Sequence, residues 1–132
     1  MAGLTDIHHM YAVIVDDSPA TRIILYNLLS ECGLRVLECD SADAAIDLLH
    51  RRKEIRVVLV DWQLPPDGGY DLVRRIRTDP AICNKRIIMV TAAAGVEDVA
   101  AAIEAGIDDY LTKPFSPLAV REKLDLLGVM AA

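Results

Sequence analysis

The chain has 132 residues, 53% of them hydrophobic, and a formal net charge of −6. That length suits one domain with a substantial core and is too short for two. The negative charge argues against nucleic acid or an anionic membrane as the main partner, and no apolar stretch approaches the roughly 18 residues of a membrane-spanning helix. We therefore expect a soluble, cytoplasmic protein without direct contacts to nucleic acid or membranes.

Short apolar runs alternate with amphipathic segments about five times along the chain. The apolar runs predict strands at 11–15, 35–39, 57–60, 86–90 and 109–112. The amphipathic segments predict helices at 20–32, 42–50, 70–78, 96–105 and 117–127. Serine followed by proline precedes the first and last of these helices, as is typical of a helix start. Strands that are apolar on both faces and joined by helices indicate an α/β fold whose parallel sheet is covered on both sides.

Polar side chains follow four of the predicted strands at their carboxyl ends. Asp16 and Asp17 follow the first strand, and Asp61 follows the third. Thr91 follows the fourth, and Lys113 follows the fifth. Taken singly, each has an ordinary interpretation, such as an acid beside a helix N-terminus. Because the carboxyl ends of parallel strands share one edge, where open α/β folds bind ligands, we expect the five side chains to converge on one crevice.

These residues and their spacing resemble the receiver domains of two-component response regulators. Asp61 lies 44 residues after Asp17, and Thr91 lies 30 residues after Asp61. Lys113 follows 22 residues after Thr91. The resemblance covers residues 11–127, between a flexible N-terminal segment at 1–10 and a C-terminal tail at 128–132. It implies a flavodoxin-like (βα)5 three-layer sandwich with a five-stranded parallel sheet in the order 2-1-3-4-5.

The resemblance assigns Asp61 as the phosphoacceptor and Mg²⁺ as the cofactor. Asp16, Asp17 and Asp61 are then metal ligands, together with the backbone carbonyl of Gln63. The chemistry agrees, because a hard divalent cation with oxygen ligands offsets the repulsion among crowded carboxylates.

The resemblance also assigns the groups that bind the transferred phosphoryl group. Thr91, the amide of Ala92 and Lys113 are the expected phosphate-binding groups. They place hydrogen-bond donors and positive charge on the phosphoryl oxygens, as phosphoryl transfer requires. The peptide between Lys113 and Pro114 matches one that is cis in most receivers.

A conformational switch follows from the same resemblance. Thr91 gains a partner when Asp61 is phosphorylated, and Tyr110 matches an aromatic switch position in this family. Phosphorylation adds about two negative charges, which is a local event able to bias a surface made by the fourth helix, fifth strand and fifth helix.

The favoured function is a stand-alone signalling switch that catalyses only its own phosphorylation and dephosphorylation. Its partners are a histidine kinase or histidine phosphotransfer protein and a downstream protein target, and it is a monomer or a phosphorylation-dependent dimer. One alternative is a receiver cut from a longer regulator such as a transcription factor. A remote alternative is an aspartyl-phosphate phosphohydrolase, but such enzymes carry an acid where this chain has Gln63.

The remaining polar and small residues are interpreted as structural. His50 has no acidic companion in the sequence, and Gly68-Gly69 is interpreted as a turn. Two basic groups are expected to be solvated, Arg51-Arg52-Lys53 and Arg74-Arg75-Arg77. Three cysteines without paired spacing are expected to fill the core, Cys32, Cys39 and Cys83.

Overall fold

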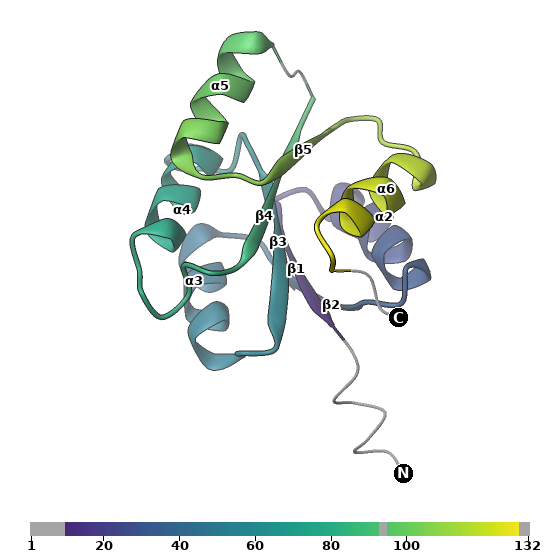
Figure 1. Ribbon diagram of the computed structural model, residues 1–132, viewed down its shortest axis with the longest axis horizontal. Coiled ribbons are helices and arrows are strands. Elements are labelled where there is room, and N and C mark those ends of the chain that lie inside the picture. The colour runs from purple at the N-terminus through teal and green to yellow at the C-terminus, as the bar shows by residue number, and fades with distance from the viewer. Residues whose placement is uncertain (1–9, 93–94, 130–132) are drawn as a thin grey trace.

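The computed structural model describes residues 10–92 and 95–129. Its centre is one parallel sheet in the order β2-β1-β3-β4-β5 (Figure 1). The strands are β1 (Tyr11–Val15), β2 (Arg35–Cys39), β3 (Ile55–Asp61), β4 (Arg86–Thr91) and β5 (Asp109–Thr112). The predicted flavodoxin-like α/β fold and its 2-1-3-4-5 strand order are confirmed.

Five helices cover the two faces of the sheet (Figure 1). They are α2 (Pro19–Glu31), α3 (Ala42–Arg51), α4 (Gly68–Arg77), α5 (Val96–Ala105) and α6 (Pro117–Leu126). Helices α3, α4 and α5 lie on one face, and α2 and α6 lie on the other. The sheet separates two hydrophobic clusters, so the core has one layer on each side of it. No helix in the described part of the chain has the length and apolar character needed to cross a bilayer.

The strand order places the candidate site. The chain passes from β1 outward to β2 and then returns to β3 on the other side of β1. Ligands in open α/β sheets bind at such a reversal, beyond the carboxyl ends of the strands. The carboxyl ends of β1 and β3 therefore border the expected binding crevice, and the buried apolar residues of these two central strands fix their position.

The start of α4 corrects the predicted turn at Gly68-Gly69. Both glycines belong to the first turn of α4, which begins two residues earlier than predicted. Gly68 has a φ of 85°, a left-handed value that glycine adopts without steric cost. Gly69 packs so closely that a Cβ there would lie 2.7 Å from the Asp61 carbonyl oxygen and 2.9 Å from Trp62 Cα. The glycine pair thus lets α4 begin directly against the end of β3.

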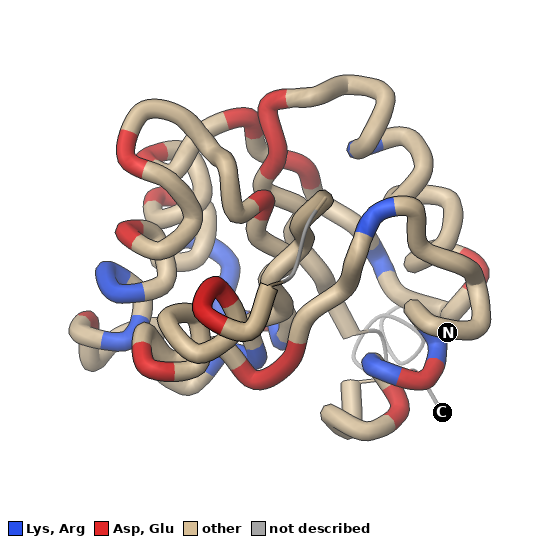
Figure 2. The backbone as a smooth tube through the Cα atoms, turned by 90° about the horizontal axis from the view of Figure 1, so that it is seen from above, with Lys and Arg blue, Asp and Glu red and all other residues tan. Residues whose placement is uncertain are grey.

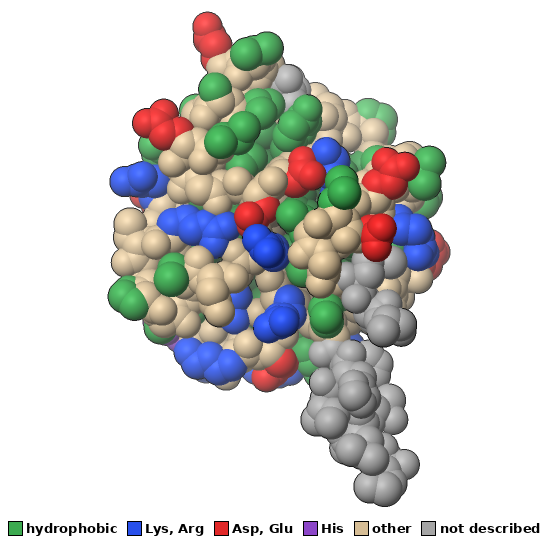
Figure 3. All heavy atoms as spheres, in the orientation of Figure 1, with side chains coloured by type: hydrophobic (Ala, Val, Ile, Leu, Met, Phe, Trp, Pro, Cys, Tyr) green, Lys and Arg blue, Asp and Glu red, His purple; other side chains and the backbone are tan. Residues whose placement is uncertain are grey.

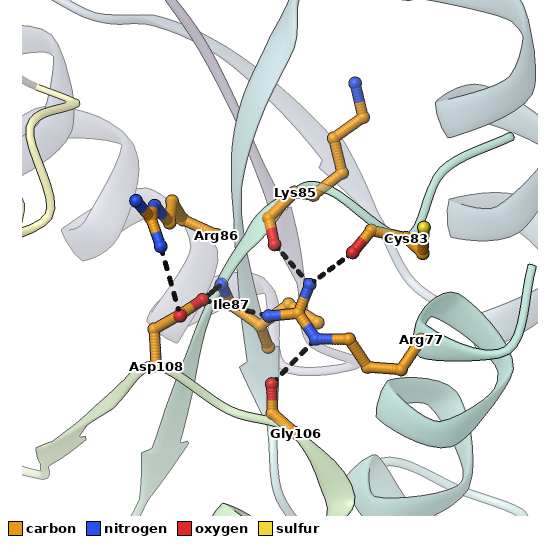
Figure 4. Close-up of polar contacts among 7 residues, drawn as sticks. All are labelled: Arg77, Cys83, Lys85, Arg86, Ile87, Gly106 and Asp108. Atoms are coloured by element: carbon orange, nitrogen blue, oxygen red, sulfur yellow. Dashed lines mark hydrogen bonds and ion pairs between the residues drawn. The ribbon is translucent and has the colours of Figure 1, made fainter. Parts of the chain in front are cut away.

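Arg77 also departs from its predicted role as a solvated cation. Its side chain is only 23% exposed, and its guanidinium donates to the carbonyl oxygens of Cys83, Lys85 and Gly106 at 2.6–2.7 Å (Figure 4). It also pairs with Asp108 at 2.9 Å. One partly buried cation therefore ties the end of α4 to the loops that precede β4 and β5.

Two smaller expectations also change. Cys83 is exposed, whereas Cys32 and Cys39 are buried as predicted. His50 has an acidic companion after all, since its Nε2 lies 2.8 Å from Asp79 Oδ2. Beyond α6, Val129 is buried in the core. The N-terminal segment predicted at 1–10 lies, except for Met10, outside the described residues.

Candidate functional site

Three carboxylates meet at the carboxyl ends of β1 and β3. Asp16, Asp17 and Asp61 each offer an oxygen, and these atoms lie within 4.8 Å of one another. Asp16 and Asp61 are buried, whereas Asp17 is exposed. Figure 2 looks down on this edge of the sheet and shows acidic segments from separate parts of the chain lying near one another. Three of the five side chains expected to converge therefore lie together.

Asp16 is held by hydrogen bonds on almost every polar atom. Its N–H donates to the Cys39 carbonyl at 3.1 Å, and its Oδ1 accepts from the Ser18 amide at 2.8 Å. Its carbonyl oxygen accepts from Arg22 Nη1 at 2.6 Å. The other carboxylate oxygen, Oδ2, is buried without a hydrogen-bond partner in the described part of the chain. A buried oxygen of this kind needs a cation, and two further carboxylates beside it suit a hard one such as Mg²⁺.

Asp61 is the second buried acid, and its side chain is 10% exposed. Burial is the main cause that raises the pKa of its carboxyl group, and the negative charges of Asp16 and Asp17 raise it further. Two contacts act in the opposite direction. The Gln63 amide donates to Asp61 Oδ1 at 3.1 Å, and Lys113 supplies positive charge. A nearby cation would favour the ionised, nucleophilic form of Asp61.

Lys113 brings positive charge to both buried acids. Its Nζ lies 3.6 Å from Asp16 Oδ2 and 4.0 Å from Asp61 Oδ1. Its amide donates to the Thr91 carbonyl at 2.8 Å, and the peptide to Pro114 is cis. Thr91 is buried at the end of β4, the strand beside β3. The ammonium therefore borders the carboxylates from the end of β5, and Thr91 lies at the end of the strand beside β3.

Tyr110 lies farther along the edge of the sheet, on β5. It is half-buried and packs against the hydrophobic cluster beneath α3, α4 and α5. Lys123 Nζ lies over its ring, 4.9 Å from the centre, and donates to Asp109 Oδ1 at 2.8 Å. The same Asp109 oxygen accepts from the Tyr110 amide at 2.8 Å. The aromatic side chain is thus fixed from α6.

Three residues of this region were not found from the sequence. Arg22 and Lys123 are ordinary helix cations until the fold brings Arg22 to Asp16 and Lys123 to Asp109. Gly69 had a signal, since it follows a pair of prolines and another glycine, but only the fold shows that α4 begins there. The contacts of Arg22 with Asp16 and of Lys123 with Asp109 join residues whose spacing in the sequence predicts no pairing.

Comparison with known proteins agrees with this geometry. The family model described as the response regulator receiver domain matches residues 12–125. The chain therefore belongs to the response regulator receiver family.

Individual relatives give the same result. A chemotaxis protein CheY homolog of Campylobacter jejuni is 38% identical over 121 residues, covering 90% of this chain and 93% of that protein. Chemotaxis protein CheY1 of Helicobacter pylori is 36% identical, and the match covers 89% of this chain and 96% of that protein. Among solved structures, the receiver domain of the sensor histidine kinase PA1611 from Pseudomonas aeruginosa superposes with a TM-score of 0.81 at 28% identity. The superposition covers 89% of this chain and 96% of that domain. That structure holds a magnesium ion in its active site cleft.

Proposed function

We propose that the protein is a phosphorylation-dependent switch in which Asp61 accepts a phosphoryl group from a histidine kinase or histidine phosphotransfer protein. The observation that carries this proposal is the meeting of Asp61 with Asp16, Asp17 and the Lys113 ammonium at one edge of the sheet. A lone buried acid would have a simpler structural explanation. An acid with two further carboxylates and a cation has the parts for phosphoryl transfer.

The proposed Mg²⁺ ligands are oxygens of Asp16, Asp17 and Asp61 and the carbonyl of Gln63. The three carboxylates and Asp16 Oδ2, which accepts no hydrogen bond in the described part of the chain, support this assignment, and the Gln63 carbonyl rests on the family resemblance. When bound, the ion supplies positive charge that neutralises both the carboxylates and the phosphoryl oxygens.

The protein side chains have separate roles in the transfer. The Asp61 carboxylate attacks the phosphorus atom of the donor, and the bond from phosphorus to the leaving group breaks. Lys113 balances charge on a phosphoryl oxygen, while the Thr91 hydroxyl and the Ala92 amide donate hydrogen bonds to the others. The protein catalyses this reaction and the later hydrolysis only on its own Asp61, so it is a signalling protein and does not turn over a separate substrate.

The proposed output is a change in the surface formed by α5, β5 and α6. Thr91 and Tyr110 couple this surface to Asp61, because a phosphoryl group draws the Thr91 hydroxyl toward itself and Tyr110 follows. Val96 and Ile103 of α5 are 87% and 61% exposed, and hydrophobic side chains gather in this region in Figure 3. Exposed apolar groups of this kind suit a protein target in the cytoplasm. A receiver that acts alone and one joined to a longer regulator would use the same switch.

Phosphorylation with a small donor tests the proposal. In the presence of Mg²⁺ and acetyl phosphate, the intact mass should rise by one phosphoryl group, roughly 80 Da. Asp61→Asn should abolish the increase. Asp67→Asn is the matched control, because Asp67 is exposed and its side chain does not cap α4. Equal labelling of Asp61→Asn and the unaltered protein would refute the assignment, and continuous turnover of a phosphomonoester would favour the phosphohydrolase.

A further inference from the structure

Arg22 contacts the peptide that joins two of the proposed metal ligands. Its Nη1 donates to the Asp16 carbonyl oxygen at 2.6 Å. That carbonyl belongs to the peptide plane between Asp16 and Asp17, so its orientation sets the direction in which both carboxylates leave the backbone. Arg22 itself has no contact with a carboxylate of the cluster. It therefore acts on the site through the backbone.

The arginine is well fixed for this purpose. It lies in the first turns of α2, where its amide donates to the Ser18 carbonyl at 3.1 Å. Its Nε lies 3.4 Å from Glu38 Oε1 on β2, and its side chain is 20% exposed. Arg22 and Glu38 together line a cavity of about 460 Å³ between α2, the end of β2 and α3. Contacts from a helix and from a neighbouring strand thus hold the guanidinium against the Asp16 carbonyl.

Arg22 acts on the Asp16–Asp17 peptide directly. The Cys39 carbonyl holds the Asp16 amide, and the Ser18 amide holds Asp16 Oδ1 in a turn that encloses this peptide. The bond from Arg22 is made to the carbonyl oxygen of the peptide itself, and it is the shortest of the three. Arg22 therefore adds to the turn a restraint on the peptide that leads to the exposed Asp17.

We infer that Arg22 is a positioning residue of the metal site, which preorganises Asp16 and Asp17 before the cation binds. This inference rests on the proposed function, because it concerns the same site. Partners that orient metal ligands typically account for about 10–100-fold in metal affinity. Arg22 belongs to this kind of partner, although it holds a carbonyl oxygen and not the ligating carboxylate.

Electrostatics alone predicts the opposite effect. Arg22 is a cation near a cation site, so its charge by itself weakens Mg²⁺ binding. Removing that charge should tighten binding if Arg22 has no positioning role. If Arg22 orients the ligands, the same substitution should weaken binding. The sign of the change therefore separates the two explanations.

The experiment measures Mg²⁺ affinity by titration calorimetry and by the fluorescence of Trp62, which adjoins Asp61 in sequence. Arg22→Met keeps the length of the side chain but loses the donor, and we expect about tenfold weaker binding. Glu38→Gln is the matched control, since it removes the ion pair and leaves the bond from Arg22 to Asp16. It should stay within about twofold of the unaltered protein, as expected for a partly exposed pair.

A measurement without Mg²⁺ distinguishes a displaced metal site from a variant that has lost its fold. Arg22→Met should shift the amide resonances of Asp17 and Ser18 without Mg²⁺, while a thermal melt shows that the variant is folded. If Arg22→Met does not fold, Arg22→Gln, which keeps a polar group too short to reach the carbonyl, replaces it with the same expectation. Unchanged or tighter Mg²⁺ binding in the folded variant would overturn the inference.

Asp17→Asn separates this inference from the proposed function. If Asp17→Asn weakens Mg²⁺ binding and Arg22→Met does not, the metal site stands and only the role of Arg22 is wrong. If the unaltered protein binds no Mg²⁺, or Asp17→Asn has no effect, the metal site itself is wrong and the role of Arg22 falls with it.

Discussion

Lys123 on α6 lies over the ring of Tyr110 on β5, with Nζ 4.9 Å from the ring centre. The same ammonium donates to Asp109 Oδ1, next to Tyr110 in the chain. Strand β5 is an edge strand, and α6 packs on the opposite face from α5. Lys123 therefore reaches across the free edge of the sheet and holds the aromatic ring from outside.

Replacement of Lys123 by methionine should release Tyr110 in the unphosphorylated protein. A cation over a partly exposed aromatic ring contributes about 0.5–1 kcal/mol, which corresponds to a change of up to about fivefold in a two-state population. Amide resonances from Asp109 to Phe115 should move part of the way toward their phosphorylated positions. Arg121→Met, an exposed cation of the same helix, is the control and should leave them in place. Shifts confined to α6 in Lys123→Met would show that Lys123 does not restrain the ring.

Thr91→Ala should separate phosphorylation from its output. The proposed nucleophile Asp61 and the other two carboxylates, Asp16 and Asp17, are unaltered, so the mass increase with acetyl phosphate should persist. A hydrogen bond to a charged group contributes about 1.5–3 kcal/mol, and its loss should suppress the shifts at Tyr110 and α5. Thr91→Ser keeps the hydroxyl and should behave normally. A complete shift pattern in Thr91→Ala would mean that another contact, such as Lys113, carries the signal.

Gly69→Ala should destabilise the protein because the added Cβ meets backbone atoms. The nearest are the Asp61 carbonyl oxygen at 2.7 Å and Trp62 Cα at 2.9 Å, neither of which can rotate away. Overpacking of this kind costs about 1–3 kcal/mol in the free energy of unfolding. Chemical denaturation measures it, with Gly95→Ala as the control, where the nearest atom lies 3.6 Å away. Equal stabilities of the two variants would contradict the close approach of α4 to β3.

Cys39 and Cys83 should differ in their reactivity toward a thiol reagent. Burial, aided by the charge of Asp40, raises the pKa of the Cys39 thiol from 9.0 to about 11, whereas Cys83 is exposed. Because the thiolate is the reactive form, a thiol reagent at pH 8 should modify Cys83 well before Cys39 in the folded protein. Mass mapping of the labelled peptides identifies the site. Labelling of Cys39 as fast as Cys83 at pH 8 would contradict its burial.

The raised pKa of the Cys39 thiol also makes the free energy of unfolding depend on pH. The folded state holds the Cys39 proton more tightly than the unfolded state, so stability is retained below pH 9 and falls as the pH rises toward 11. Lysines and tyrosines also titrate in this range, so the measurement is the difference between the unaltered protein and Cys39→Ala. The variant should lose less stability over that interval. An equal loss in both would show that Cys39 ionises as freely in the folded state as in the unfolded one.

The sequence predicted the repeating elements well because their signals are local. Strand β5 and helix α5 have the predicted bounds, and the serines before α2 and α6 accept hydrogen bonds from the amides of Thr21 and Ala119 as helix caps. The strand ends of a parallel sheet also share an edge by geometry, so the meeting of Asp16, Asp17 and Asp61 followed from the fold class alone.

The contacts that the sequence missed depend on tertiary packing. Arg77 was interpreted as a solvated cation because its helix is rich in arginine, yet it meets carbonyl oxygens from two separate loops. His50 and Asp79 lie 29 residues apart and pair between α3 and the loop after α4. Cys83 was placed in the core by its residue type, although it lies in an exposed loop. No spacing rule predicts any of these contacts.

The bonds of Arg77 give α5 one fixed end. Its Nε donates to the Gly106 carbonyl oxygen, immediately after the last residue of α5, and its Nη2 pairs with Asp108 before β5 begins (Figure 4). The opposite end of α5 begins at Val96, on the side of Thr91 and the proposed phosphoacceptor Asp61. A helix that is anchored at one end and pulled at the other rotates about its anchored end. Displacement caused by phosphorylation should therefore be greatest near Val96 and fall steadily to almost nothing at Gly106.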